Sequence, residues 1–139
     1  MRIPDRLVVD TNVFASAILF PRSPPRRVVD DALDQGVVLF SEATMRELTE
    51  VFSRSKFDRY VSRQERELVL AQIGRSAELV PIIRLVRECR HPEDDKFLEV
   101  ALNGRATVII TGDADLLALH PWRGVAILAP AEFLKSLDI

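Results

Sequence analysis

The sequence predicts an α/β protein, built as a three-layer α/β/α sandwich around a mostly parallel central sheet of four to five strands. Two observations lead to this fold. Short and almost continuous apolar runs, typical of strands buried on both faces, occur at residues 7–9, 37–40 and 107–111. Segments with helical periodicity separate these runs, which favours parallel strands covered by helices. The length of 139 residues suggests one domain over residues 1–139.

In the first half of the chain, turn and capping residues separate two strands from three helices. Three prolines between residues 21 and 25 end the first helix, because proline cannot continue one. Ser23 caps the following helix, Gly36 ends it, and Ser41 caps the third helix. The elements expected here are strands over 7–9 and 37–40, and helices over about 12–19, 24–35 and 42–53.

The second half begins with a polar turn over residues 54–60, in which Phe57 and Tyr60 are expected to plug the core. Ser62 and Glu65 form a capping box that opens the next helix. An apolar stretch that contains Pro81 then suits an edge strand or an extended linker. The remaining elements expected are a helix over 92–104, a strand over 107–111, a short helix over 115–119, a strand over 125–128 and a closing helix after residue 130.

Two carboxylates stand just after two of the predicted strands. Asp10 follows the strand over 7–9, and Asp113 follows the strand over 107–111, after Gly112. Ligands of open α/β sheets bind outside the carboxyl ends of the strands, so both acids are expected at one functional crevice. Asp10 alone is also explained as a helix cap. Two such acids in one small sheet are hard to attribute to two independent caps.

Two helices supply further acids. Asp94 lies at the centre of the apolar stripe of the helix over 92–104, where a carboxylate is costly unless it is paired or bound to a metal. Asp95 points about a quarter-turn away and suits a first-turn acid that favours the helix dipole, a role also open to Asp94. On the third helix, periodicity cannot choose between Glu42 and Glu47, because both border its buried stripe.

Several carboxylates without neighbouring histidine or cysteine match a hard divalent cation. Mg²⁺ and Mn²⁺ take oxygen ligands, and the chain has only two histidines and one cysteine. Such an ion polarises a phosphodiester and lowers the pKa of a bound water. The acids therefore favour metal-assisted phosphodiester hydrolysis. Because like charges repel, the pKa values of the acids are expected to be raised.

The charge of the chain neither indicates nor excludes a nucleic-acid partner. Lysine and arginine number 19 against 21 aspartates and glutamates, so any contact with phosphates must be local. Candidates for these contacts lie around the proline-rich loop and the third helix: Arg22, Arg26, Arg27, Arg46, Arg54, Lys56 and Arg59. Taken singly, each is more often a solvated surface charge.

The composition excludes several other classes. No apolar run approaches the ~18 residues that a membrane span needs. The lone Cys89 excludes an internal disulfide framework, and with only two histidines a structural zinc site is excluded as well. We expect a cytoplasmic protein with no membrane partner, because a single free cysteine fits a reducing compartment.

Five motifs follow one another over nearly the whole chain. They are VDTNV at 9–13, PPRR at 24–27, SE at 41–42 with EL at 47–48, HPEDDKFLE at 91–99, and TGDADLL at 111–117. Each is weak alone, and all five in order are strong. Together they resemble the PIN-domain ribonucleases, in particular the VapC-type toxins of bacterial toxin–antitoxin pairs.

The resemblance implies a PIN-like α/β/α sandwich in which an acidic quartet binds Mg²⁺ or Mn²⁺ and cleaves single-stranded RNA. Carried over by position, the residues that ligate the metal and catalyse are Asp10, Glu47, Asp94 and Asp113. Residues that would orient or support them are Asn12, Asp95, Thr111 and Asp115. The resemblance thus selects Glu47, which periodicity could not. His91 stands where the family often has an acid and is not assigned as a ligand.

The same resemblance implies partners. Toxins of this type usually form dimers and are inhibited by an antitoxin segment that occupies the active-site groove. It therefore implies a homodimer, an RNA substrate and a cognate antitoxin.

Two other functions stay open. One is a module that keeps the fold and binds nucleic acid or protein without cleaving, which the complete quartet argues against. The other is a phosphoryl-accepting receiver domain, also a small α/β fold with acids at strand ends. A receiver needs an acceptor aspartate after a middle strand and a lysine after the last long strand. Here the second strand is followed by Ser41, and no lysine follows the strand over 107–111.

Overall fold

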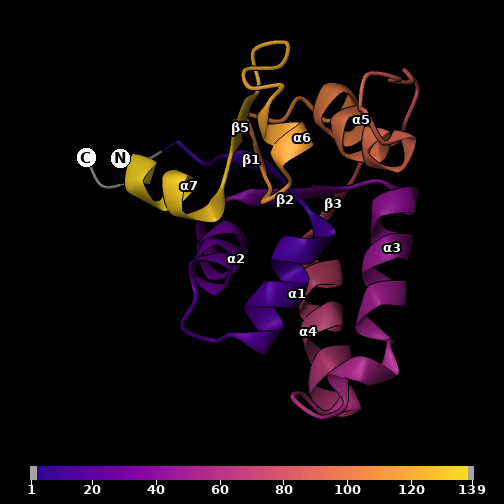
Figure 1. Cartoon of the computed structure of the whole chain (residues 1–139), viewed down its shortest axis with the longest axis vertical. Helices are drawn as coiled ribbons and strands as arrows, with labels where there is room; N and C mark the ends of the chain where they lie inside the picture. The colour runs from indigo at the N-terminus through magenta and orange to yellow at the C-terminus, as the bar shows by residue number, and fades with distance from the viewer. Residues whose placement is uncertain (1–2, 138–139) are drawn as a thin grey trace.

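The computed structural model describes residues 3–137, and within them five parallel strands form one sheet in the order β3-β2-β1-β4-β5 (Figure 1). The strands are β1 (Arg6–Val9), β2 (Val37–Phe40), β3 (Glu78–Leu79), β4 (Val108–Ile110) and β5 (Ala126–Leu128). The predicted α/β fold with a parallel sheet covered by helices is therefore confirmed.

Helices occupy most of the segments between these strands. They are α1 (Thr11–Leu19), α2 (Pro24–Gln35), α3 (Glu42–Phe52), α4 (Arg63–Ser76), α5 (Asp95–Asn103), α6 (Ala114–Leu117) and α7 (Pro130–Leu137), with 3₁₀ turns η1 (Ser55–Phe57) and η2 (Pro92–Asp94). The predicted caps Ser23, Ser41 and Ser62 each accept a hydrogen bond from the backbone N–H three residues later. Across residues 3–137, no helix has the length and apolar character that crossing a membrane requires.

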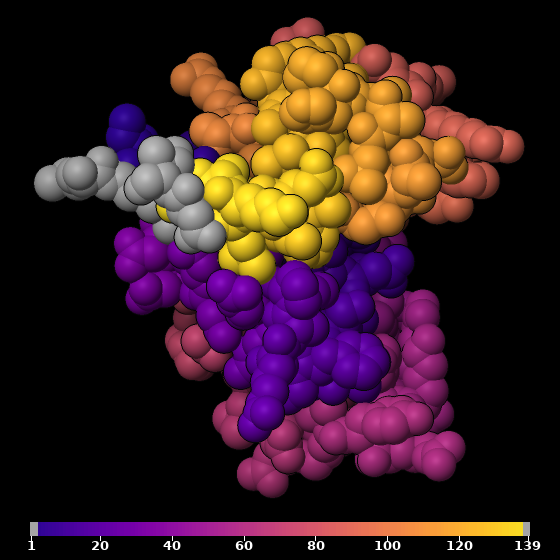
Figure 2. Space-filling view, turned by 60° about the vertical axis from the view of Figure 1, so that its left-hand side comes forward, coloured from indigo at the N-terminus to yellow at the C-terminus, as the bar shows by residue number. Residues whose placement is uncertain are grey.

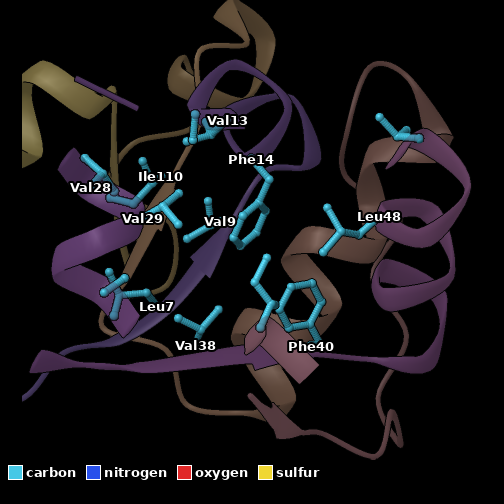
Figure 3. Close-up of a cluster of buried hydrophobic side chains, with 14 of the residues drawn as sticks. Leu7, Val9, Val13, Phe14, Val28, Val29, Val38, Phe40, Leu48 and Ile110 are labelled. Atoms are coloured by element: carbon cyan, nitrogen blue, oxygen red, sulfur yellow. The ribbon is translucent and has the colours of Figure 1, made fainter. Parts of the chain in front are cut away.

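The alternation of side chains along the strands divides the core into two halves. On one face of the sheet, Leu7, Val9 and Phe40 pack with side chains of α1, α2 and α3 (Figure 3). On the other face, Val8 and Ile109 pack with side chains of α5 and α6. The last helix, α7, is yellow in Figure 2 and lies directly against violet α2. Strand β1 is thus covered on both faces and paired on both edges.

Two predicted features differ in the structure. The helix expected over 92–104 is divided into η2 and α5, so that the α-helix begins at Asp95 instead of at Pro92. Tyr60 was expected to plug the core together with Phe57, and this prediction is wrong for Tyr60, which is 69% exposed. Phe57 is buried as predicted, and the second buried side chain comes from Val61, the next residue after Tyr60.

Gly104, at the end of α5, is a position where a larger side chain should destabilise the fold. A Cβ there would lie 2.9 Å from the carbonyl oxygen of Val100, 2.9 Å from Cγ2 of Val80 and 3.0 Å from Cδ1 of Leu39. We predict that Gly104→Ala lowers the free energy of unfolding by about 1–3 kcal/mol, because the surrounding side chains must shift. Urea denaturation measures this change.

The matched control is Gly74→Ala on α4, where nothing lies within 4 Å of the added Cβ. This control should raise the free energy of unfolding by about 0.5–1 kcal/mol, since alanine is the better helix former. Equal stabilities of the two variants would contradict the packing described for Gly104.

Candidate active site

The pairing of β1 with β4 positions the first two acids. Val9 lies opposite Ile110 in the sheet, and the backbone N–H of Asp10 donates to the carbonyl oxygen of Ile110 at 2.9 Å. The buried hydroxyl of Thr111 donates to Oδ2 of Asp10 at 2.7 Å and accepts from the backbone N–H of Asp113 at 3.0 Å. Thr111 therefore fixes the position of Asp10 relative to Asp113.

A pocket of about 590 Å³ at this end of the sheet is lined by all four acids of the expected quartet. Asp10 follows β1, Glu47 comes from α3, Asp94 ends η2, and Asp113 precedes α6. The other residues that line the pocket are Thr11, Asn12, Glu50, Val51, Arg54, Phe97 and Gly112. The fold thus brings carboxylates from four separate segments to one concave surface.

Glu47 differs from the other three acids because the chain itself balances its charge. Its Oε1 accepts a hydrogen bond from the Thr11 hydroxyl at 2.5 Å, and its Oε2 lies 2.7 Å from Nζ of Lys96. The side chain of Lys96 is only 17% exposed, so water screens this ion pair less than it would at the surface. The ammonium group also donates to the carbonyl oxygen of Glu93. Lys96 was not among the site residues expected from the sequence.

Burial and mutual repulsion alter the ionisation of two acids. Burial raises the pKa of Asp10, and the charges of Glu47 and Asp113 raise it further, while hydrogen bonds from Thr111 and the backbone of Asn12 partly oppose the rise. Burial likewise raises the pKa of Asp94, with repulsion from Asp113 and Asp10 next in size. The expected upward shift is confirmed for these two carboxyl groups.

Asp113 provides the observation that bears most directly on a metal ion. Its Oδ2 is buried and has no hydrogen-bond partner, which is costly for an ionised carboxylate unless a cation or proton satisfies it. In residues 3–137, no three acidic, histidine or cysteine side chains are near enough to form a ready-made metal cluster. Mg²⁺ commonly binds through one or two carboxylates and keeps waters, so Asp113 with Asp10 or Asp94 fits such an ion without a closed cage.

The expected supporting residues divide into two groups. Thr111 contacts Asp10 directly, and Asn12 contributes its backbone N–H to Asp10 Oδ1 at 3.2 Å while its side chain is exposed. Asp115 lies outside the pocket and faces His91 at 3.4 Å and Arg90 at 3.9 Å. Its backbone N–H reaches Asp113 Oδ1 at 3.4 Å, which is a weak link to the site.

Asp95 also lies outside the pocket, and its role is structural. Its Oδ1 accepts hydrogen bonds from the backbone N–H groups of Glu88 at 3.1 Å and Cys89 at 2.8 Å. Burial alone would raise the pKa of Asp95, but these hydrogen bonds outweigh it and hold that pKa below its usual value. Asp95 is therefore the buried acid of the pair, whereas periodicity had directed Asp94 inward, because the α-helix begins one turn later than expected.

The four arginines expected to hold RNA, which are Arg22, Arg26, Arg27 and Arg46, do not line the acidic pocket. Arg26 pairs with Asp30 at 3.2 Å and Arg46 with Glu42 at 2.6 Å, each one helical turn away. The arginine that does line the pocket is Arg54, which Glu50 holds at 2.8 Å. The cations beside the acids are thus Arg54 and Lys96.

Comparisons with known proteins give matches in sequence and in structure. The family model of the PIN domain matches residues 6–115. An uncharacterized protein of Methanocaldococcus jannaschii is 30% identical over 121 residues, which cover 86% of this chain and 77% of that protein. Its description assigns no activity.

Two solved structures share the fold. PAE2754 from Pyrobaculum aerophilum superimposes with a TM-score of 0.62 at 17% identity, covering 98% of this chain and 91% of that one. VapBC2 from Rickettsia felis, solved bound to a DNA fragment from its promoter, gives a TM-score of 0.58 at 11% identity, covering 88% and 96%. At these identities the likeness is one of fold.

Replacing Asp94 by its neutral isostere should stabilise the metal-free protein. An acid whose pKa is higher in the folded than in the unfolded chain weakens folding as the pH rises, because the unfolded chain releases the proton more readily. We predict that Asp94→Asn raises the Tm in EDTA by a few degrees at pH 7, and by less at pH 4, where Asp94 is largely protonated.

Differential scanning calorimetry measures both values. Asp34→Asn, an exposed aspartate near the end of α2, is the control and should leave the Tm unchanged. A lower Tm for Asp94→Asn at pH 7 would show that the carboxylates do not repel one another as described.

Proposed function

The chain belongs to the PIN domain family, whose members are generally nucleases, and from this premise we propose that it is a metal-dependent endoribonuclease. It would hydrolyse phosphodiester bonds of single-stranded RNA. The observation that carries the proposal is the buried, unpartnered Oδ2 of Asp113 in a pocket that three more carboxylates line. Family membership leaves the receiver-domain alternative without support.

Asp10, Asp94 and Asp113 are the residues that would hold Mg²⁺ or Mn²⁺. When bound, such an ion polarises a phosphodiester and lowers the pKa of a water molecule. Thr111 keeps Oδ2 of Asp10 in place through its hydroxyl, so that the orientation of this carboxylate is set before any ligand arrives. Phe97 lines the same pocket and excludes water from one side.

Glu47 and Lys96 form the adjustable part of the site. In the metal-free protein the ammonium group of Lys96 neutralises Glu47. Engaging Glu47 as the fourth acid of the quartet means separating this pair, which leaves the Lys96 ammonium group available for a phosphate of the substrate. Arg54, held by Glu50 at the edge of the pocket, is a second cation within reach of the RNA backbone.

The biological setting is also part of the proposal. The fold that this chain shares with VapBC2, a toxin–antitoxin complex, supports a role as the toxin of such a pair. A cognate antitoxin would then be its protein partner, and a cytoplasmic homodimer its working form. The motif order at residues 9–13, 91–99 and 111–117 supports the same assignment.

Cleavage of RNA should depend on the acidic pocket. We predict that the protein cleaves single-stranded RNA with Mg²⁺ or Mn²⁺, that EDTA stops the reaction, and that Asp10→Asn and Asp113→Asn each lower kcat/KM by at least about 100-fold. Gel analysis of end-labelled RNA measures the rates, with Asp34→Asn as an active control. Cleavage that survives both substitutions would reject the site, and metal-dependent RNA binding without cleavage would favour a binding module.

Lys96 should weaken metal binding in the free protein, because its positive charge lies beside Glu47. We predict that Lys96→Gln binds Mn²⁺ several-fold more tightly by isothermal titration calorimetry. Lys135→Gln, an exposed lysine on α7, changes the net charge equally and should leave the affinity unchanged. Weaker binding by Lys96→Gln would mean that the ion pair is needed to position Glu47.

A further inference from the structure

A second pocket, also of about 590 Å³, adjoins the acidic one. It lies between α1 and the turn that contains η1, and its lining residues are Asn12, Ala15, Ser16, Leu19, Lys56, Phe57, Arg59 and Tyr60. Asn12 lines both pockets, so the surface is continuous from the carboxylates to the turn. A chain-like ligand held at the acids can therefore extend over Asn12 into the second pocket.

The charge of the second pocket is opposite to that of the first. None of its lining residues is acidic, and Lys56 and Arg59 are exposed and form no ion pair with any residue between 3 and 137. The neighbouring Asp58 is already paired with Arg66. Lys56 and Arg59 thus carry positive charge that the chain leaves unbalanced, which suits a phosphate backbone.

Tyr60 is the aromatic ring of this pocket, and the fold holds it outward. Its side chain is exposed, while Phe57 and Val61 on either side anchor the turn in the interior. Beneath the turn, the buried Arg66 donates to the carbonyl oxygen of Arg54 at 2.9 Å. The ring is therefore displayed on a segment that side chains fix from below, with the guanidinium carbon of Arg59 5.9 Å from the ring centre.

We propose that Tyr60, Lys56 and Arg59 form a binding subsite for a nucleotide of single-stranded RNA next to the bond that is cleaved. An unpaired base stacks on the ring of Tyr60, and the two cations contact the flanking phosphates. The inference rests on the proposed function and names the part of the surface that holds the substrate. An exposed ring with interleaved cations and no acid fits this ligand better than an apolar protein segment does.

Equilibrium binding tests the subsite without requiring cleavage. Fluorescence anisotropy of a labelled oligouridine of about 12 nucleotides is measured in EDTA, so that no metal-dependent cleavage occurs. Tyr60→Ala should weaken binding about 5- to 100-fold, whereas Tyr60→Phe, which keeps the ring, should bind like the wild type. Leu68→Ala, at an equally exposed large side chain on α4, is the matched control. Unchanged affinity of Tyr60→Ala would overturn the inference.

The salt dependence of binding tests the two cations separately. The double variant Lys56→Gln with Arg59→Gln should reduce the slope of log affinity against log salt by about 2, one for each lost phosphate contact. Lys135→Gln should leave the slope as it is. A double variant with the wild-type slope would overturn the assignment of these two residues.

Cleavage by the same variants separates failure of the subsite from failure of the proposed function. If RNA is cleaved, Tyr60→Ala should raise KM with kcat nearly retained, and an unchanged KM overturns the subsite alone. If no RNA is cleaved but binding still depends on Tyr60, the subsite stands and the nuclease proposal fails. If Tyr60→Ala instead dissociates a dimer in sedimentation velocity while RNA binding is kept, the turn is a protein interface and the inference is overturned.

Discussion

The pairing of β1 with β4 is the contact on which the acidic pocket depends. Because Val9 lies opposite Ile110, the two strands end together, and the residues after them, Asp10 and Thr111, leave the sheet side by side. Both strands are buried on both faces, so this end of the sheet cannot move apart without exposing the two apolar halves of the core. The repulsion among the acids is sustained by that packing.

The pocket combines acids whose charges are neutralised to different degrees. Glu47 is paired with Lys96, Asp10 receives two hydrogen bonds, and Oδ2 of Asp113 is buried without a partner. A cation therefore gains most by contacting Asp113, and least by displacing Lys96 from Glu47. The same gradient continues outward, since the positive charges of Lys56 and Arg59 lie in the adjoining pocket. An anionic chain would be attracted by these cations and by a cation bound among the acids.

The sequence was sufficient to predict the features that depend on local pattern. The buried strands, their order with the helices, and the acids Asp10 and Asp113 at strand ends follow from short apolar runs that end in a carboxylate. Glu47 needed the resemblance, because periodicity alone gives Glu42 an equal claim. The partner of Lys96 and the outward position of Tyr60 depend on how distant segments meet, and the buried position of Asp95 on where α5 begins, so no local pattern could reveal them.

Locating a metal ion in crystals tests the central claim most directly. Crystals of the wild-type protein soaked in Mn²⁺ would be measured by anomalous diffraction at the manganese absorption edge. The account predicts an anomalous peak in contact with Oδ2 of Asp113 and with a carboxylate oxygen of Asp10 or Asp94. A peak held only by other acids, such as Asp115, or no peak at saturating Mn²⁺, would contradict it.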